Sequence, residues 1–446
     1  MDIRFLFYKS RKLAPEARWF LFQWSRTIGL HQSLICPLVE LYRWLGMSAQ
    51  HGRSALELLK RQGYVVYTPV RQGKGRPVSS HHISPGFRFS LEELKVPTPI
   101  HQAEIESLCR QAFAVRQARK YKAQNLMSGE ERARMLTPAT YWLLCVLLAH
   151  AESPGVVRGL SYGRLQSITG MTKERLKSQL SKLKRLGLIV RHEPGELRSQ
   201  GEVRMCSVYV LDLAHALLWG ERSMVRKTLF ITPELGSVSC LSGFYEASVV
   251  ACKIVESLEG RPYGQRAMAL EESLETCLSI LPPREYLEPA VKDLLRINRL
   301  GISRVLKAHV QSFVMTLLSN HWGDLERKDG PFPIDAVMEA ISRDCVSLID
   351  HPGVQSETRP YNPLLLLVYA WAHCIAVDIQ NNLKLQPMDD QDLAGATFLI
   401  KEILKGGRAH WEVNLYHRSA NQEGDDGHVA YVLQSINLQR LKGLAV

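Results

Sequence analysis

Between Leu160 and Leu213 the sequence packs helical and strand patterns into a short span. Ser161–Ile168 has helical character and stops at Gly170. Thr172 then opens a second helix, because a threonine at the N-cap accepts a hydrogen bond from the free N–H groups of the first turn. Gly187 ends that helix, as a left-handed C-terminal cap commonly does. Leucines recur at the spacing of one helical face, at positions Leu176, Leu180 and Leu183.

Two strand-like segments follow this helix. Residues 188–192 have strand composition, residues 193–202 are polar and rich in turn residues, and residues 203–211 are again β-branched and apolar. The order is therefore a helix, a tight turn, a second helix and a β-hairpin. The second helix has a polar, mostly basic face, and such a face fits the major groove of B-DNA, which is about one helix wide. The alternative is a small packing module whose basic helix is only solvated.

The same pattern occurs once more, 124 residues earlier. Gly46–Gly63 aligns without a gap on Gly170–Gly187. Spacing retained in both copies indicates a duplicated unit. The first copy has Gly52 where the second has the apolar Leu176, so we expect its helix to be the less stable of the two. The identical pairs are Gly46/Gly170, Met47/Met171, Ser54/Ser178, Leu56/Leu180, Leu59/Leu183, Lys60/Lys184, Arg61/Arg185 and Gly63/Gly187.

The first copy also continues as a hairpin with a basic turn. Strand composition covers residues 64–67 and returns up to Ile83, and the turn between them carries Arg71, Lys74 and Arg76. The stretch from Lys74 to Pro77 resembles the core of an AT-hook, whose arginine lies in narrow A·T minor grooves. A slim basic loop fits a groove of about 6 Å in which the negative potential is enhanced. A merely solvated loop is the other interpretation.

Charge divides the chain into a basic and an acidic part. Residues 1–135 hold 22 Lys and Arg against 10 Asp and Glu, residues 136–230 hold 14 against 7, and residues 231–446 hold 20 against 27. A net charge of +19 over the first 230 residues indicates a part that binds nucleic acid, and the acidic remainder indicates a part with another task. A long basic helix within residues 97–135 would space the two copies, line phosphates, pair in a dimer or act only as a connector.

The acidic part predicts a helical domain. Apolar residues recur with helical periodicity through most of residues 229–446, so we expect an all-α domain for homodimerisation or contact with another protein. Its longest apolar run, Leu364–Val377, is interrupted by His373 and is shorter than a membrane span, which indicates a buried helix. The N-terminus has no secretory cleavage pattern, and the nine cysteines show no zinc spacing. We therefore expect a cytoplasmic, nucleoid-associated protein without metal or cofactor and, because no catalytic motif occurs, without enzymatic activity.

The Leu160–Leu213 segment resembles the winged helix-turn-helix of bacterial transcription regulators, through Thr172, the three leucines, Gly187 and the hairpin. It covers one eighth of the chain, and the second copy brings the resemblance to about a quarter. Two such units in one chain are also similar to the tandem arrangement of plasmid replication initiators, which bind repeated origin sites. The helix between the copies and the acidic helical part have no counterpart in the compact two-domain form of those proteins.

These patterns predict a mainly α fold with small β-hairpin wings. We expect a first winged-helix domain over residues 1–96, a basic helical linker over 97–135, a second winged-helix domain over 136–228 and the all-α domain over 229–446. The predicted function is sequence-specific binding of double-stranded DNA by a transcription regulator. A replication initiation or maintenance factor of a plasmid or integrative mobile element is one alternative. A non-catalytic protein-interaction scaffold is the other.

The expected DNA contacts lie on the second helix and the hairpin of each copy. In the second copy, the helix would meet the major groove through Thr172, Lys173, Arg175, Lys177, Ser178, Lys182 and Arg185. Flanking phosphates would be contacted by Arg191 and Arg198. In the first copy, the corresponding helix residues are Gln50, Arg53, Ser54 and Arg61, and the minor-groove residues are Arg71, Lys74 and Arg76.

Overall fold

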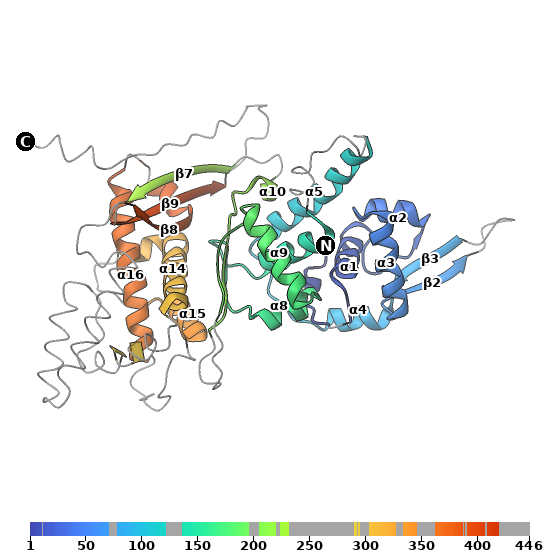
Figure 1. Ribbon diagram of the computed structural model, residues 1–446, viewed down its shortest axis with the longest axis horizontal. Coiled ribbons are helices and arrows are strands. Elements are labelled where there is room, and N and C mark those ends of the chain that lie inside the picture. Colours follow the sequence, from blue (N-terminus) through green and yellow to red (C-terminus); the bar gives the residue numbers. More distant parts are fainter. Residues whose placement is uncertain are drawn as a thin grey trace, which may run out of the picture. The chain divides into compact units, whose positions relative to one another are not determined.

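The computed structural model describes residues 1–10, 12–70, 78–121, 136–195, 205–219, 224–231, 290–291, 293–294, 303–326, 333–345, 362–386, 388, 390–405 and 408–418. Over these residues the chain is mostly helical and forms three small antiparallel sheets of three strands each. It divides into two compact units, Met1–Arg191 with Tyr209–Arg222 and His192–Val208 with Ser223–Val446. Figure 1 shows the helices and strands of both units.

The first unit contains two copies of one set of elements. The first copy begins with the 3-10 turn η1 (Ile3–Leu6) and continues with α1 (Pro15–Thr27), β1 (Leu34–Ile35), α2 (Leu38–Trp44), α3 (Ala49–Arg61), β2 (Val65–Val70), β3 (Val78–Ile83) and α4 (Pro85–Glu92). After α5 (Gln102–Tyr121), the second copy contains α7 (Pro138–Ala149), β4 (Val156–Val157), α8 (Tyr162–Thr169), α9 (Lys173–Arg185), β5 (Ile189–Glu193), β6 (Val208–Leu211) and α10 (Ala216–Trp219).

The two copies agree in connectivity and in helix length. Their sheets have the orders β1-β3-β2 and β4-β6-β5, so the short strand before the two helices pairs with the last strand of the hairpin in both. α3 and α9 have 13 residues each and begin 124 residues apart. Ser48 caps α3 by accepting a hydrogen bond from the backbone N–H of His51, and Thr172 caps α9 by accepting one from Arg175. The repeat found in the sequence therefore extends to the shared order of helix, short strand, two helices and hairpin, whereas η1 occurs only in the first copy and α4 is longer than α10.

α1 and α7 pack against each other and hold the two copies together. Trp19 of α1 stacks on Tyr141 of α7 with ring centroids 5.5 Å apart, and Phe22 of α1 meets Trp142 edge-on at 5.7 Å. All four side chains are buried in one continuous core that also includes residues of α3 and α9. Aromatic pairs of this kind add about 0.5–1.5 kcal/mol each beyond the burial of their area. The two copies thus share a single hydrophobic core.

α5 belongs to the same core. The apolar residues Ile105, Leu108, Cys109 and Ala112 of this helix are buried, and the helix packs on α7 and α10. Its first half is therefore part of the body of the unit, which excludes a purely solvated connector for that half. The basic part predicted for this helix begins at Arg116, and the side chains from that residue onwards are outside the described part of the structure.

The two copies fill the space between their second and third helices differently. In the first copy Tyr42 of α2 is buried, and a Cβ atom on Gly52 of α3 would lie 2.3 Å from its ring carbon Cδ1. The corresponding residues of the second copy are Gln166 and the buried Leu176. From the sequence, Gly52 was expected to make α3 less stable than its counterpart in the second copy. In the structure, it makes room for a large side chain from α2.

The second unit combines helices with a sheet. Its elements are β7 (Met224–Ile231), α14 (Ser303–Asn320), the 3-10 turn η2 (Trp322–Glu326), α15 (Asp335–Cys345), α16 (Pro363–Lys384), α17 (Asp390–Ala394), β8 (Thr397–Lys405) and β9 (Arg408–Arg418). β9 is the central strand and pairs antiparallel with β7 and β8. The expectation of an all-α domain over residues 229–446 is therefore wrong. The fold is mainly α, with a sheet in each copy of the first unit and a third sheet in the second unit.

One face of the third sheet packs on the helices. Phe398 of β8 stacks on Trp322 with ring centroids 5.3 Å apart, and the side-chain amide of Gln311 on α14 donates to the carbonyl oxygen of Ile400 at 2.6 Å. Residues on the same face of β9, Trp411 and Val413, are also buried. The sheet is thus tied to η2 by apolar contact and to α14 by a buried hydrogen bond.

α16 is the central helix of the second unit and packs on α14 and α15. Among the described residues it is the one helix whose length and composition alone would allow it to cross a membrane. Within the unit, however, 67% of its most apolar 18-residue window is buried. The buried helix predicted from the apolar run at Leu364–Val377 is confirmed.

Candidate nucleic-acid interface

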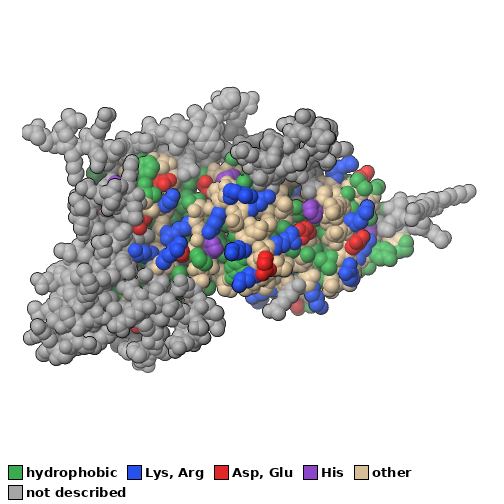
Figure 2. Space-filling model, in the orientation of Figure 1, with side chains coloured by type: hydrophobic (Ala, Val, Ile, Leu, Met, Phe, Trp, Pro, Cys, Tyr) green, Lys and Arg blue, Asp and Glu red, His purple; other side chains and the backbone are tan. Residues whose placement is uncertain are grey.

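α9 turns its leucines into the core and most of its cations outwards. Leu176, Leu180 and Leu183 are buried, as predicted. Gln179 adds a polar link, because its carbonyl oxygen accepts a hydrogen bond of 2.6 Å from the hydroxyl group of Thr140 on α7. The predicted contacts that are exposed on this helix and its cap are Thr172, Lys173, Lys177, Ser178 and Arg185. Lysine and arginine side chains are visible over this face in Figure 2.

Lys184 is also exposed on α9, although it is not among the predicted contacts, and so are Glu174 and Ser181. Lys173, Lys177 and Lys184 stand four and seven residues apart, so they form one stripe along the helix. Ser178 and Arg185 lie seven residues apart on the adjoining stripe. The spacing of Lys184 from Lys177 was the signal that would have identified it.

Arg175 lies apart from these residues. Its guanidinium group forms an ion pair with both carboxylate oxygens of Glu16, at the start of α1, with one N–O distance of 3.3 Å. The Glu16 side chain is largely buried, at 18% exposure. The pair neutralises the charge of Arg175 and ties the first turn of α9 to the first copy.

Lys182 lies at the edge of the basic face. It is half-buried, and burial together with the neighbouring Arg185 lowers the pKa of its ammonium group. A long side chain in this position packs its stem on apolar surface and carries its charge at the margin. Of the predicted cations on α9, Lys173, Lys177 and Arg185 are therefore the ones presented fully to solvent.

α3 presents the equivalent face of the first copy. Its predicted contacts Gln50, Arg53, Ser54 and Arg61 are all exposed, as expected for the polar side of this helix. Ser54 and Arg61 occupy the positions of Ser178 and Arg185 in the second copy. The face is less basic than that of α9, because each helix exposes one glutamate, Glu57 or Glu174, but α3 exposes fewer cations. The ammonium group of Lys60 lies 4.7 Å from the centre of the Tyr67 ring. Burial lowers the pKa of Lys60.

The two hairpins differ in their surroundings. The β2–β3 hairpin projects from the first copy (Figure 1), with Val66, Tyr67 and Thr68 of β2 exposed. Its predicted minor-groove residues Arg71, Lys74 and Arg76 lie outside the described residues.

The outer half of the β5–β6 hairpin belongs to the second unit. There Glu193 accepts an ion pair of 2.8 Å from Arg304 of α14, and Nε2 of His309 lies 3.2 Å from the carbonyl oxygen of Cys206. Arg191, at the base of the hairpin, is half-buried, and Arg198 lies outside the described residues. In its described part, the second hairpin thus contacts α14 through Glu193 and Cys206.

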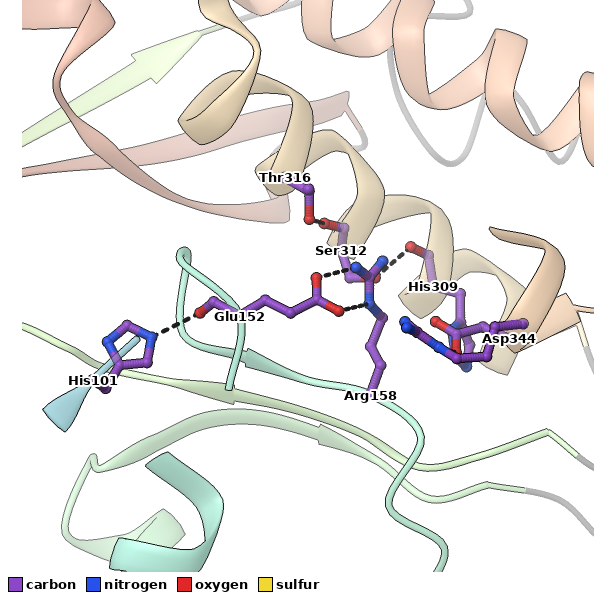
Figure 3. A network of polar contacts seen from close by, with 8 residues as sticks. His101, Glu152, Arg158, His309, Ser312, Thr316 and Asp344 are labelled. Carbon is purple, nitrogen blue, oxygen red and sulfur yellow. Dashed lines mark hydrogen bonds and ion pairs between the residues drawn. The ribbon is translucent and has the colours of Figure 1, made fainter. Parts of the chain in front are cut away.

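Figure 3 shows polar side chains, most of them buried, whose residue types could belong to a catalytic site. In the first unit, the guanidinium group of Arg158 binds the carboxylate of Glu152, with Nε of Arg158 3.2 Å from Oε1, and Nε2 of His101 lies 2.8 Å from the carbonyl oxygen of Glu152. Arg158 and His101 are buried, and buried charges require partners of this kind. This network supports the loop between α7 and β4.

In the second unit, Nδ1 of His309 lies 3.8 Å from Oδ2 of Asp344 on α15, and both residues are buried. The hydroxyl group of Ser312 donates to the backbone carbonyl oxygen of His309 at 2.6 Å, and that of Thr316 donates to the carbonyl oxygen of Ser312 at 3.0 Å (Figure 3). An activated serine needs its hydroxyl directed at a base, and here it is directed at its own helix. The described residues also contain no group of three or more His, Cys, Asp or Glu that could hold a metal ion.

Comparison with protein-family models finds no match for this chain, and comparison with curated protein sequences finds none either. Function is therefore inferred from the repeated elements and from the side chains that they expose.

Proposed function

We propose that the first unit is a pair of winged helix-turn-helix domains that bind double-stranded DNA. The observation that carries this proposal is the basic outer face of α9, placed on a helix that is capped, turned and followed by a hairpin in the order typical of this fold. α2 with α3 and α8 with α9 would be the two helix-turn-helix pairs, and β2–β3 and β5–β6 the wings. Winged helix-turn-helix folds bind several kinds of partner, so the choice of DNA as the ligand has to rest on the exposed side chains.

Among the described elements, α9 gives the strongest support for DNA as the ligand. Its exposed stripe of Lys173, Lys177 and Lys184 suits the phosphates along a groove, since these contacts position a protein without reading sequence. Ser178 and Arg185, on the adjoining stripe, would face base edges, where arginine pairs with guanine in a bidentate manner. Ser54 and Arg61 repeat this pair on α3, so the two helices would make similar contacts.

The shared core supports one composite site for the two helices. Because α1 and α7 pack through buried aromatic rings, α3 and α9 would approach DNA as one body and meet two half-sites at a fixed separation. This arrangement favours recognition of a bipartite sequence. We assign the chain to transcription regulation, in the cytoplasm, with the second unit serving dimerisation or contact with a partner protein and with neither cofactor nor catalysis involved.

The pairing of two such domains in one body also favours a second candidate, a replication initiation or maintenance factor of a plasmid or mobile element. The two functions differ in where the protein binds. Genome-wide mapping of bound DNA separates them, because a regulator would occupy promoters and an initiator would occupy repeats within an origin.

The decisive experiment is selection of bound duplexes from a random-sequence pool, followed by affinity measurements on the selected DNA. Arg185→Ala should weaken binding by about 1–3 kcal/mol and relax specificity at one position, and Lys177→Ala should weaken binding to all sequences alike. Lys95→Ala, which removes an exposed cation from the loop after α4, is the matched control and should leave affinity unchanged.

The proposal is overturned if no duplex is enriched and binding to a random-sequence duplex shows no dependence on salt. Affinity that is carried by phosphate contacts falls steeply as salt rises. Salt-insensitive binding of a protein partner in place of DNA would instead support the scaffold function.

A further inference from the structure

The N-terminal strap, defined here as residues 8–10 and 12–13, packs on the first copy along one side. The ring of Tyr8 meets that of Phe87 edge-on at 5.3 Å, and Phe87 in turn meets Tyr64 edge-on at 4.7 Å. The hydroxyl groups of Ser10 and Tyr64 lie 3.4 Å apart. These contacts fix the beginning of the strap beside the segment that follows α3.

The other end of the strap reaches the second copy at the turn between α8 and α9. The backbone N–H of Ser10 donates to the carbonyl oxygen of Ser167, near the end of α8, at 3.2 Å. Gly170, in this turn, has a φ of 70° and lies so close to the strap that a Cβ atom on it would be 1.9 Å from the carbonyl oxygen of Leu13. The turn before α9 is therefore in direct contact with the strap.

Arg18 of α1 locks this arrangement. Its guanidinium group donates to the carbonyl oxygens of Leu13 at 3.1 Å, Tyr8 at 2.9 Å and Ser167 at 3.1 Å, and also to that of Ser10. The residue is 2% exposed, and burial lowers its pKa to about 10, so it remains charged at neutral pH. A single buried fork of donors thus holds three strap carbonyls and one carbonyl of α8 together, which the one ammonium group of a lysine would not match.

The side chains that the strap leaves outside are cations. Lys9 and Lys12 are exposed, whereas Leu13 is buried in the core and Tyr8 is half-buried. Lys12 directly precedes Leu13, which touches the turn two residues before the N-cap of α9. The N-terminal end of a recognition helix is the part that approaches the bases, so cations beside it lie near the flanking phosphates.

We infer that the strap is a third DNA-contacting element, in which Lys9 and Lys12 bind phosphates beside the first turn of α9, with Arg18 as the positioning residue that holds them there. This inference rests on the proposed DNA-binding function of the same unit. It assigns to the second copy a contact surface that comes from the N-terminus of the chain, and it makes α9 with the strap the strongest phosphate-binding part of the pair.

Lysine footprinting by mass spectrometry tests this on the full chain, with a random-sequence DNA duplex at low salt as the probe. Acetylation of Lys9, Lys12, Lys177 and Lys184 should fall severalfold when DNA is added, while that of Lys95 stays constant. Protection of Lys177 and Lys184 without protection of Lys9 and Lys12 overturns the inference and leaves the proposed function intact. Absence of protection at all four lysines overturns both.

Variants give an independent measurement. Lys9→Ala with Lys12→Ala removes two phosphate contacts. The negative slope of log K against log salt should therefore become shallower, its magnitude decreasing by about 2. Lys95→Ala with Lys401→Ala removes the same charge from exposed positions on other elements and is the matched control. Equal slopes for the strap variant and the wild type overturn the inference.

Arg18→Lys tests the positioning role, because it keeps the charge but loses the fork. Trypsin should cleave after Lys9 and Lys12 at least severalfold faster in this variant than in the wild type, and the slope should fall as in the double variant. If cleavage accelerates while the slope stays at the wild-type value, the strap does not need its clamp to bind phosphate and the role assigned to Arg18 is wrong.

Discussion

At the scale of single residues, the two copies show how one packing problem is solved twice. In the first copy, the large side chain between the second and third helices is Tyr42, and Gly52 leaves the space for it. In the second copy, the core side chain is Leu176, opposite the half-buried Gln166. The large core side chain thus comes from the second helix in the first copy and from the third helix in the second copy, and a close-packed interior leaves room for only one of the two.

Gly52→Leu should therefore destabilise the first unit by about 1–3 kcal/mol, the usual effect of overpacking. Gly52→Leu combined with Tyr42→Gln copies the arrangement of the second copy and should recover a large part of that loss. Urea unfolding followed by tryptophan fluorescence measures both. Gly163→Ala, on α8, is the control because a Cβ atom there meets nothing within 4 Å. Additive effects of the two changes would contradict the proposed exchange.

His150 gives the first unit a predictable dependence on pH. It is largely buried against Phe7, with ring centroids 4.5 Å apart, and Nδ1 donates to the carbonyl oxygen of Val146 at 2.9 Å. Burial lowers the pKa of His150 to about 4, below its ordinary value of 6.5. The unfolded chain therefore takes up the proton first, so stability is complete above about pH 6.5 and is lost as the pH falls towards 4.

Each pH unit below about 6.5 should remove up to about 1.4 kcal/mol through this group. Urea midpoints at pH 7.5 and pH 5.5 measure the effect, and His150→Phe should make the difference between them smaller. It should not abolish that difference, because burial also lowers the pKa of His81 to about 4. An unchanged difference in the variant would mean that His150 is not held neutral in the folded state.

At the scale of elements, the sequence predicted best where local signals decide the structure. α9 begins after Thr172 and ends before Gly187, as predicted, since an N-cap hydroxyl and a glycine at positive φ act over one turn. The exposed side of α9 could be predicted from the leucine spacing, which is also a local signal. The ion pair of Arg175 could not be predicted, because its partner Glu16 stands 159 residues away in the sequence.

The strands of the second unit were missed because they depend on distant pairing. Residues 391–404 lie in the domain predicted to be all-α, yet only the α17 part of them is helical, and β8 begins at Thr397. Leu393 and Ile400 are buried and stand seven residues apart, a spacing that fits one face of a helix. The strand is decided by β9, which also pairs with β7 from far earlier in the chain. No local pattern carries that information.

At the scale of the whole molecule, the shared core changes what two DNA-binding domains can do. A flexible linker would let each domain find its own half-site. Here α1, α5 and α7 form one core under both copies, and the strap joins Tyr64 of the first copy to Ser167 of the second. The proposed recognition helices are therefore held at one separation.

DNA spacing tests this coupling directly. In a selected bipartite site, insertion of about half a helical turn, roughly 5 base pairs, between the half-sites should remove the contribution of one helix, because the second half-site rotates to the far side of the duplex. Insertion of a full turn, about 10 base pairs, restores the facing but moves the half-site by about 34 Å. A rigid pair cannot follow that displacement, so both insertions should reduce affinity to that of a single half-site.

Gel-shift titration at fixed salt measures this affinity, and the variants Arg61→Ala and Arg185→Ala show which helix no longer contributes to binding. Recovery of full affinity at the longer spacing would mean that the two copies separate on DNA and that the core seen between α1 and α7 opens.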